Sequence, residues 1–193
     1  MAKLKGPLMS MDARGQFGKM TVYGGWKGLK TARAYVVPAN PKSTKQVAQR
    51  GKMSAAVEAY KDAEVNDLDK AAFNVAASLE AKPMSGFNYV TKRHIAAAIA
   101  GDAPQIMRSF EVSANTGGSI TVEVAGDENV NAGARYGSTP SSLTQTKAGS
   151  WTGTDLSVTI TGLTPGNTVY LQFYTEAEGK EIISGIYAVL VAE

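Results

Sequence analysis

The chain has 193 residues, of which 44% are hydrophobic, and it carries 20 Lys and Arg against 17 Asp and Glu. This length and composition suffice for one or two packed cores. The sequence contains no cysteine and a single histidine, His94. These counts exclude a disulfide framework, thiol catalysis and Cys-ligated zinc, and they argue against His-pair metal sites and a histidine-based triad.

The small net charge of +3 conceals an uneven distribution along the chain. Residues 1–108 carry 17 basic and 8 acidic side chains, whereas residues 109–193 carry 3 basic and 9 acidic side chains. The first 57 residues hold 11 basic groups and one acid, Asp12. Such an asymmetry predicts two parts that differ in architecture and that contact different surroundings.

The sequence gives no sign of a membrane segment. The longest apolar run is the seven residues from Ile186 to Ala192, whereas a membrane helix needs roughly 20. The first 15 residues contain basic side chains but no apolar core of a signal peptide. We therefore expect a protein that is made in a cytoplasm and has no membrane partner.

Residues 1–42 are rich in glycine, which favours extended chain and turns over helix. Gly24-Gly25 and Lys27-Gly28 bracket Trp26 and predict a turn there, so the segment is expected to form a β-hairpin. The first strand would hold Phe17, Met20, Val22 and Tyr23. Its partner strand would hold Leu29, Ala32, Tyr35, Val36 and Val37. Pro38 and Pro41 would end the extended run.

Three helices are expected next. The first should begin near Ser43, which forms a capping-box pattern with Gln46. The second should begin at Asn66 or Asp67, with an apolar stripe of Leu68, Ala72, Val75 and Leu79. The third should run from Ser85 to Gly101, after which the linker Gly101–Pro104 would close a first domain of residues 1–104.

After Arg108 the hydrophobic period changes from 3.6 to 2. Phe110 and Val112 alternate with polar residues, a turn is expected at 115–118, and Ile120, Val122 and Val124 alternate again. Further strands are predicted at 132–138, 143–148, 155–161, 168–176 and 182–191. Seven short strands separated by turn residues predict a second domain, residues 108–193, that is an antiparallel β-sandwich.

The segment 162–170, Gly-Leu-Thr-Pro-Gly-Asn-Thr-Val-Tyr, resembles the fibronectin type III and immunoglobulin-like family. Leu163, Pro165, Gly166, Thr168 and Tyr170 match the turn and tyrosine corner of that family. The resemblance implies that Pro165-Gly166 makes the turn and that the Tyr170 hydroxyl bonds back to the corner backbone. The fold class expected overall is α+β in two domains, with an all-β immunoglobulin-like sandwich as the second.

Several short motifs in residues 10–95 resemble a domain common in tailed-phage and prophage proteins. They are Phe17-Gly18-Lys19-Met20-Thr21-Val22, Gly25-Trp26-Lys27-Gly28, Ala34-Tyr35-Val36-Val37-Pro38, Asn40-Pro41-Lys42-Ser43-Thr44-Lys45-Gln46 and Ser85-Gly86-Phe87-Asn88. Tyr60 and Phe73 depart from this group, which often has tryptophans at those positions. The resemblance implies a virion component that is synthesised in the host cytoplasm.

A basic cluster in the amino-terminal part is the candidate interaction site. It comprises Lys19, Lys27, Lys30, Arg33, Lys42, Lys45, Arg50 and Lys52, with Trp26 and Tyr35 as interleaved anchoring groups. The lysines are dispersed and no DNA-reading helix is visible, so an acidic protein surface is favoured over nucleic acid. The alternative is a solvated face of a domain that has few acids.

No nucleophile–base pair, carboxylate pair or ligand set emerges, so no catalytic residue, cofactor or metal is predicted. His94 lies on an apolar stripe and is expected to be a packed side chain. We therefore expect a non-enzymatic structural protein of a tailed-phage particle, in multiple copies, that binds capsid, neck or tail proteins. The alternatives are a nucleic-acid-binding accessory protein, or a carbohydrate- or receptor-binding module that acts through loops such as 115–118 and 137–142.

Overall fold

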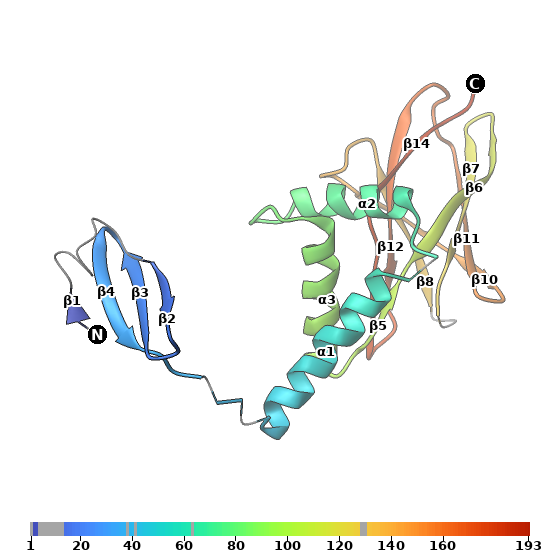
Figure 1. The fold of residues 1–193 in the computed structure, drawn as a ribbon. Coiled ribbons are helices and arrows are strands. Elements are labelled where there is room, and N and C mark those ends of the chain that lie inside the picture. The colour runs from blue at the N-terminus through green and yellow to red at the C-terminus, as the bar shows by residue number, and fades with distance from the viewer. Residues whose placement is uncertain (1, 4–13, 38, 41, 63, 128–130) are drawn as a thin grey trace. The chain divides into compact units, whose positions relative to one another are not determined.

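The computed structural model describes residues 2–3, 14–37, 39–40, 42–62, 64–127 and 131–193. Within them, three α-helices and several β-sheets give a mixed α/β structure (Figure 1). The contacts divide the chain into two compact units, Met1–Ser43 and Thr44–Glu193. This division differs from the boundary expected near residues 104–108, because the second and third helices pack against strands of the carboxy-terminal part and the first helix packs on the third.

The first unit holds one antiparallel sheet of four strands in the order β1-β4-β3-β2. The strands are β1 Ala2–Lys3, β2 Gly15–Phe17, β3 Thr21–Trp26 and β4 Leu29–Ala34. The predicted hairpin is confirmed as β3 and β4, but its first strand is shorter than expected: Phe17 lies in β2 and Met20 in the turn before β3. Trp26 lies in β3 and not in the turn. Tyr35, Val36 and Val37 follow β4 instead of extending it, and Pro38 and Pro41 lie outside the described residues.

The turn between β3 and β4 consists of Lys27 and Gly28 alone. Both residues have positive φ, 49° and 78°, as a two-residue type I′ turn requires. Trp26 and Leu29 consequently face each other as the last pair of the ladder.

The helices are α1 Thr44–Tyr60, α2 Asp67–Ser78 and α3 Gly86–Ala100. Their predicted starts are confirmed: Asn66 caps α2 in a capping box with Asp69, and Ser85 caps α3. Gly101 ends α3 with a φ of 96°, a left-handed conformation that glycine adopts without a Cβ penalty.

The buried face predicted for α2 is confirmed at Ala72 but wrong at its three larger residues. Leu68, Val75 and Leu79 are exposed, whereas the helix buries Asp69, Ala72, Phe73, Ala76 and Ala77. Small alanines and one phenylalanine fill the narrow space between the helices and the strands, and the larger leucines lie outside it.

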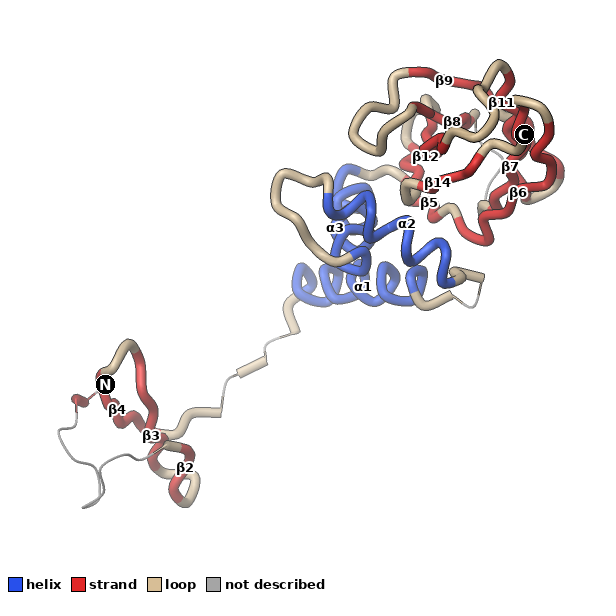
Figure 2. Tube along the Cα trace, turned by 90° about the horizontal axis from the view of Figure 1, so that it is seen from above, coloured by secondary structure: helices blue, strands red, loops and turns tan. Residues whose placement is uncertain are grey.

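The predicted linker Gly101–Pro104 is also wrong in part, because β5 Ala103–Ile106 begins inside it. β5 pairs in parallel with β13 Lys180–Ile183. The side chains of Ile106, Ile183 and Ile186 join Phe73, Tyr89 and Val90 of the helices in one buried cluster, which we call the helix-side cluster. Figure 2 shows the three helices gathered on one side of the strands of this unit.

Two further sheets form the rest of the second unit, in the orders β10-β11-β7-β6 and β14-β12-β8-β9. Their strands are β6 Arg108–Thr116, β7 Ser119–Ala125, β8 Ala132–Gly137, β9 Gln145–Ala148, β10 Ser150–Thr152, β11 Asp155–Thr161, β12 Thr168–Thr175 and β14 Tyr187–Leu190. The sequence pattern missed the short β10, and the strand expected at 182–191 is divided by Ser184–Ile186.

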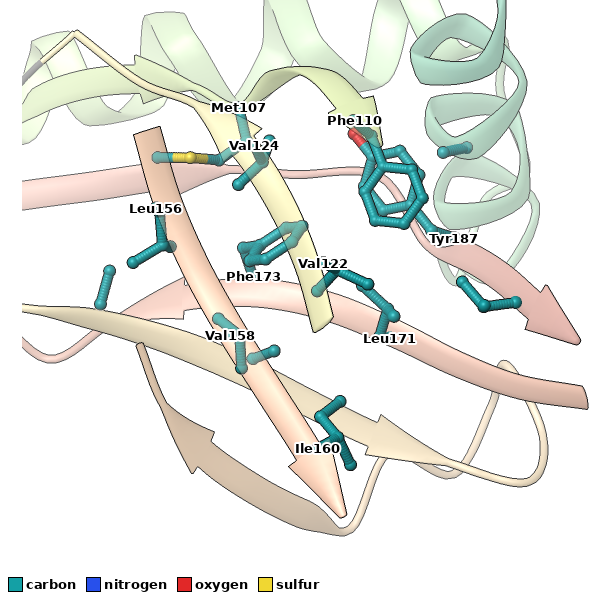
Figure 3. Packing of buried hydrophobic residues seen from close by; sticks show 14 of the residues in the cluster. Met107, Phe110, Val122, Val124, Leu156, Val158, Ile160, Leu171, Phe173 and Tyr187 are labelled. Carbon is teal, nitrogen blue, oxygen red and sulfur yellow. The ribbon is translucent and has the colours of Figure 1, made fainter. Parts of the chain in front are cut away.

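The inward side chains of the two sheets share one core (Figure 3). Val122 and Val158 come from the first sheet, and Leu171 and Phe173 from the second. The alternation of buried and outward residues along β7, β11 and β12 agrees with the predicted period of two.

The Asp69 carboxylate ties the helices to the sheets. It is fully buried and accepts hydrogen bonds from the backbone N–H groups of Asn66, Ser109 and Phe110, at 3.1, 2.8 and 3.3 Å. The Tyr187 hydroxyl donates a fourth bond at 2.9 Å. Burial, together with the charge of Asp69, raises the pKa of Tyr187 well above its usual value.

The segment 162–170 forms the expected turn but not the expected side-chain bond. Asn167 N–H donates to the Thr164 carbonyl at 3.3 Å, and Gly166 has a φ of 78° after Pro165, as in a type II turn. The Tyr170 ring lies on the outward side of β12 and packs against the helix-side cluster. Its hydroxyl makes no hydrogen bond to any described residue, so the predicted corner bond is not present there.

Candidate docking surface

The register of β3 and β4 determines which side chains of the first sheet lie together. Directly paired residues of an antiparallel ladder project from the same face. Val22 pairs with Arg33, Gly24 with Thr31, and Trp26 with Leu29. We call the face formed by these six residues the Trp26 face.

The Trp26 face is hollowed at its centre. A cavity of about 700 Å³ is lined by Val22, Gly24, Gly25, Trp26, Leu29, Thr31 and Arg33. Gly24 supplies no side chain there, and a Cβ built on it would meet only the Thr31 hydroxyl, at 3.8 Å. That hydroxyl donates to the Gly24 carbonyl at 3.1 Å and is thereby held at the edge of the hollow.

The first unit has no core among its described residues 14–37, 39–40 and 42–43, since none of them is buried. Trp26 is 69% exposed and Leu29 is 49% exposed. Covering a tryptophan that is exposed to this degree contributes about 3 kcal/mol. A small sheet needs a covered apolar face for stability, so the Trp26 face has the properties of a surface that binds another protein.

The first unit is rich in cations. Residues 1–43 contain eight Lys and Arg and one acid. Lys19 and Lys27 lie in the two turns that flank β3, and Arg33 lies on the Trp26 face itself. None of these three side chains makes a hydrogen bond or ion pair with a described residue, so their charges are available to a partner.

The other predicted residues are not brought to this face. Lys30 projects from the opposite face, Tyr35 follows β4, and Lys42 lies between the sheet and α1. Lys45, Arg50 and Lys52 lie on α1, in the second unit. The Lys52 ammonium donates to the Ala98 carbonyl of α3 at 2.9 Å, so it joins two helices.

His94 is 9% exposed on α3, as expected of a packed histidine, and its Nδ1 has no partner among the described residues. Burial lowers the pKa of this imidazole. In the part of the chain that the structure describes, no three carboxylate or imidazole groups lie close enough together to hold a metal ion. The same residues include no helix that is long and apolar enough to cross a bilayer.

The lowered pKa predicts a pH dependence of stability. The unfolded chain takes up the His94 proton near pH 6.5, above the pKa of the folded chain, so the free energy of unfolding should fall as the pH falls below about 6.5. Replacing His94 with phenylalanine should remove this part of the slope. Urea unfolding at about pH 7.5 and pH 5.5 measures it, and identical slopes for parent and variant would contradict the prediction.

A second hollow lies at one end of the two facing sheets. Its volume is about 320 Å³, and its lining is free of charged side chains. It brings together Tyr136, Gly137, Ser138, Ser142, Thr144, Gln145, Thr161, Gly162, Leu163, Thr164, Asn167, Thr168 and Val169. The predicted loop 137–142 contributes to it.

The sequence shows the excess of acids in residues 109–193 but not which of them lie together, because it does not show which strands pair. β6 and β7 place Glu111 directly opposite Glu123. The Trp26 face was not predicted either, because the sequence does not show the register of β3 and β4, although Trp26 and Arg33 were both among the candidate residues. No protein-family model matches this chain, and the search of curated proteins gave no match either.

Proposed function

We propose that this chain is a non-enzymatic structural protein of a tailed-phage particle and that its Trp26 face docks onto another protein. The docking role is carried by one observation: a basic sheet in which none of residues 14–37 is buried exposes Trp26 and Leu29 around a hollow. The assignment to a phage particle is supported by the resemblance of residues 10–95. Multiple copies in the particle are part of the proposal.

We also propose that residues 108–193 form a sandwich of the fibronectin type III and immunoglobulin-like kind. The strand orders β10-β11-β7-β6 and β14-β12-β8-β9 support this, because they correspond to the ABED and GFCC′ sheets of that fold. The turn at Pro165-Gly166, at the start of β12, is a second supporting feature.

The chemistry of the Trp26 face favours a protein partner over nucleic acid. Arg33 is the one cation on the described face, and its neighbours there are Val22, Trp26 and Leu29. Affinity for nucleic acid comes mainly from several phosphate contacts and falls steeply with salt. A mixed apolar and cationic surface instead suits a partner with an apolar spot beside a carboxylate.

Quantitative mass spectrometry of purified particles tests the proposal. A chain with Trp26→Ala and Arg33→Gln should lose most of its incorporation, because a central tryptophan anchor contributes at least about 2 kcal/mol, roughly 30-fold in affinity. Leu190→Ala with Lys82→Gln makes a similar change on exposed residues of the second unit and should incorporate normally. Absence of the parent protein from particles, or normal incorporation of the first variant, would reject the proposal.

The nucleic-acid alternative makes a different prediction in solution. Binding of the full chain to duplex DNA should then weaken steeply as salt rises, with a slope set by the number of phosphates neutralised. We expect no such slope below physiological salt.

A carbohydrate-binding role is a second candidate because of the uncharged hollow at the end of the sheets. Hydroxyl and amide groups of Gln145, Asn167 and Thr168 make no hydrogen bond to described residues, and Tyr136 provides an aromatic ring. Hydrogen bonds from such groups beside an aromatic ring suit a neutral sugar. A glycan array with the full chain should give hits that Gln145→Ala with Asn167→Ala removes, and an array without hits rejects this role.

A further inference from the structure

Two carboxylates face each other on the outward side of the sheet β10-β11-β7-β6. Glu111 of β6 is directly opposite Glu123 of β7, and Asp155 of β11 lies in the same shallow surface hollow. Glu111 and Glu123 make no hydrogen bond or ion pair with a described residue. We call Glu111, Glu123 and Asp155 the Glu123 patch.

This arrangement costs stability within the chain. Like charges that are directly opposite across a strand pair destabilise it. The guanidinium of Arg108, which lines the same hollow, is bound by Glu64 and by Asp127 at 2.6 Å, so its charge is already shared by two other carboxylates. The negative charge of the patch therefore remains available to a cation from outside this unit.

A small apolar side chain adjoins the carboxylates. Ala125 of β7 is directly paired with Asp155 and lines the same hollow. The Glu123 patch therefore holds three carboxylates beside a methyl group, whereas the Trp26 face holds the Arg33 guanidinium beside Trp26 and Leu29. The two surfaces are complementary in charge.

We propose that the Trp26 face of one copy docks on the Glu123 patch of a second copy. Charge complementarity selects this occupant: eight basic groups and one acid in residues 1–43 would meet the acidic carboxy-terminal part, with 3 basic and 9 acidic groups in residues 109–193. The inference rests on the proposed docking role of the Trp26 face and names its partner.

The proposed contact joins two different surfaces, so a dimer keeps one free face on one copy and one free patch on the other. Such a head-to-tail contact produces a ring when the rotation closes and a filament when it does not. The self-association of the full chain should therefore continue beyond a dimer, and it should weaken as salt screens the charges.

Sedimentation velocity of the full chain tests this proposal with two disabled variants. Trp26→Ala with Arg33→Gln disables the face, and Glu111→Gln with Glu123→Gln disables the patch. Each variant alone should remain monomeric where the parent assembles, with a dissociation constant raised about tenfold or more. Mixed together, they should form a 1:1 dimer that does not grow, because the mixture offers one intact face and one intact patch.

Glu176→Gln with Glu178→Gln is the matched control, since it removes the same charge from exposed positions outside the patch. It should assemble like the parent, and unchanged circular dichroism and thermal midpoints should exclude misfolding of any variant. A parent that is monomeric at all concentrations, or a patch variant that assembles normally, would overturn the proposal. Normal particle incorporation of that patch variant, together with loss for the face variant, would leave the proposed function intact.

Discussion

Replacing Asp69 with alanine is expected to lower the free energy of unfolding by about 4 kcal/mol. The substitution removes the acceptor of four hydrogen bonds, three from backbone N–H groups and one from the Tyr187 hydroxyl. These donors are held by α2, β6 and β14 and cannot all reach water, so the desolvation cost of several of them remains unbalanced. Urea unfolding of the full chain, followed by circular dichroism, measures the loss.

Two further variants make this test specific. Asp67→Ala lies in the same helical turn, but its carboxylate is fully exposed beside Lys70, so its effect should stay within about 0.5 kcal/mol. Tyr187→Phe removes one of the four bonds and should cost about 1 to 2 kcal/mol. Similar losses for Asp69→Ala and Asp67→Ala would show that the carboxylate does not join the helices to the sheets.

Gly185→Ala should lower the free energy of unfolding by about 2 to 3 kcal/mol. A Cβ at this position would lie 2.5 Å from the carbonyl carbon and the Cβ of Ala72, and 2.7 Å from the backbone nitrogen of Phe73. Because two of these atoms belong to the backbone of α2, no side-chain rotation relieves the clash. The helix would have to move away from the segment between β13 and β14, where Ile186 N–H donates to the Ala72 carbonyl at 3.1 Å.

Gly51→Ala provides the control for this substitution. A Cβ at Gly51 meets nothing within 4 Å, and the residue lies inside α1. The same chemical change should therefore stabilise the helix, by up to about 1 kcal/mol. Equal thermal midpoints for the two glycine variants would contradict the close approach of α2 to Gly185.

Local chemistry explains which parts of the fold were predictable. Asn66, Ser85 and Gly101 mark helix ends through bonds or backbone angles that involve only neighbouring residues, and their positions were predicted correctly. The buried face of α2 was not, because its alanines leave the hydrophobic pattern ambiguous. The burial of Asp69 depends on donors from β6 and β14, which no local pattern contains.

The candidate site was likewise predictable only where local sequence determines it. Trp26, Lys30 and Arg33 were recognised from composition, but their distribution over two faces follows from the register of β3 and β4. Lys52 has the same charge as the others and yet donates to a helix carbonyl. The opposition of Glu111 and Glu123 arises only when two strands pair, so sequence composition alone could not reveal it.

The bond between Asp69 and Tyr187 also has a consequence for synthesis on the ribosome. Its partners are 118 residues apart, and the helix-side cluster likewise needs Ile183 and Ile186. The helices therefore leave the ribosome well before the strands that complete their core. Their apolar surface stays exposed until those strands have been synthesised. We expect chains that stop after α3 to be bound by chaperones or degraded, because residues 180–190 supply both the last apolar wall and the last hydrogen bond.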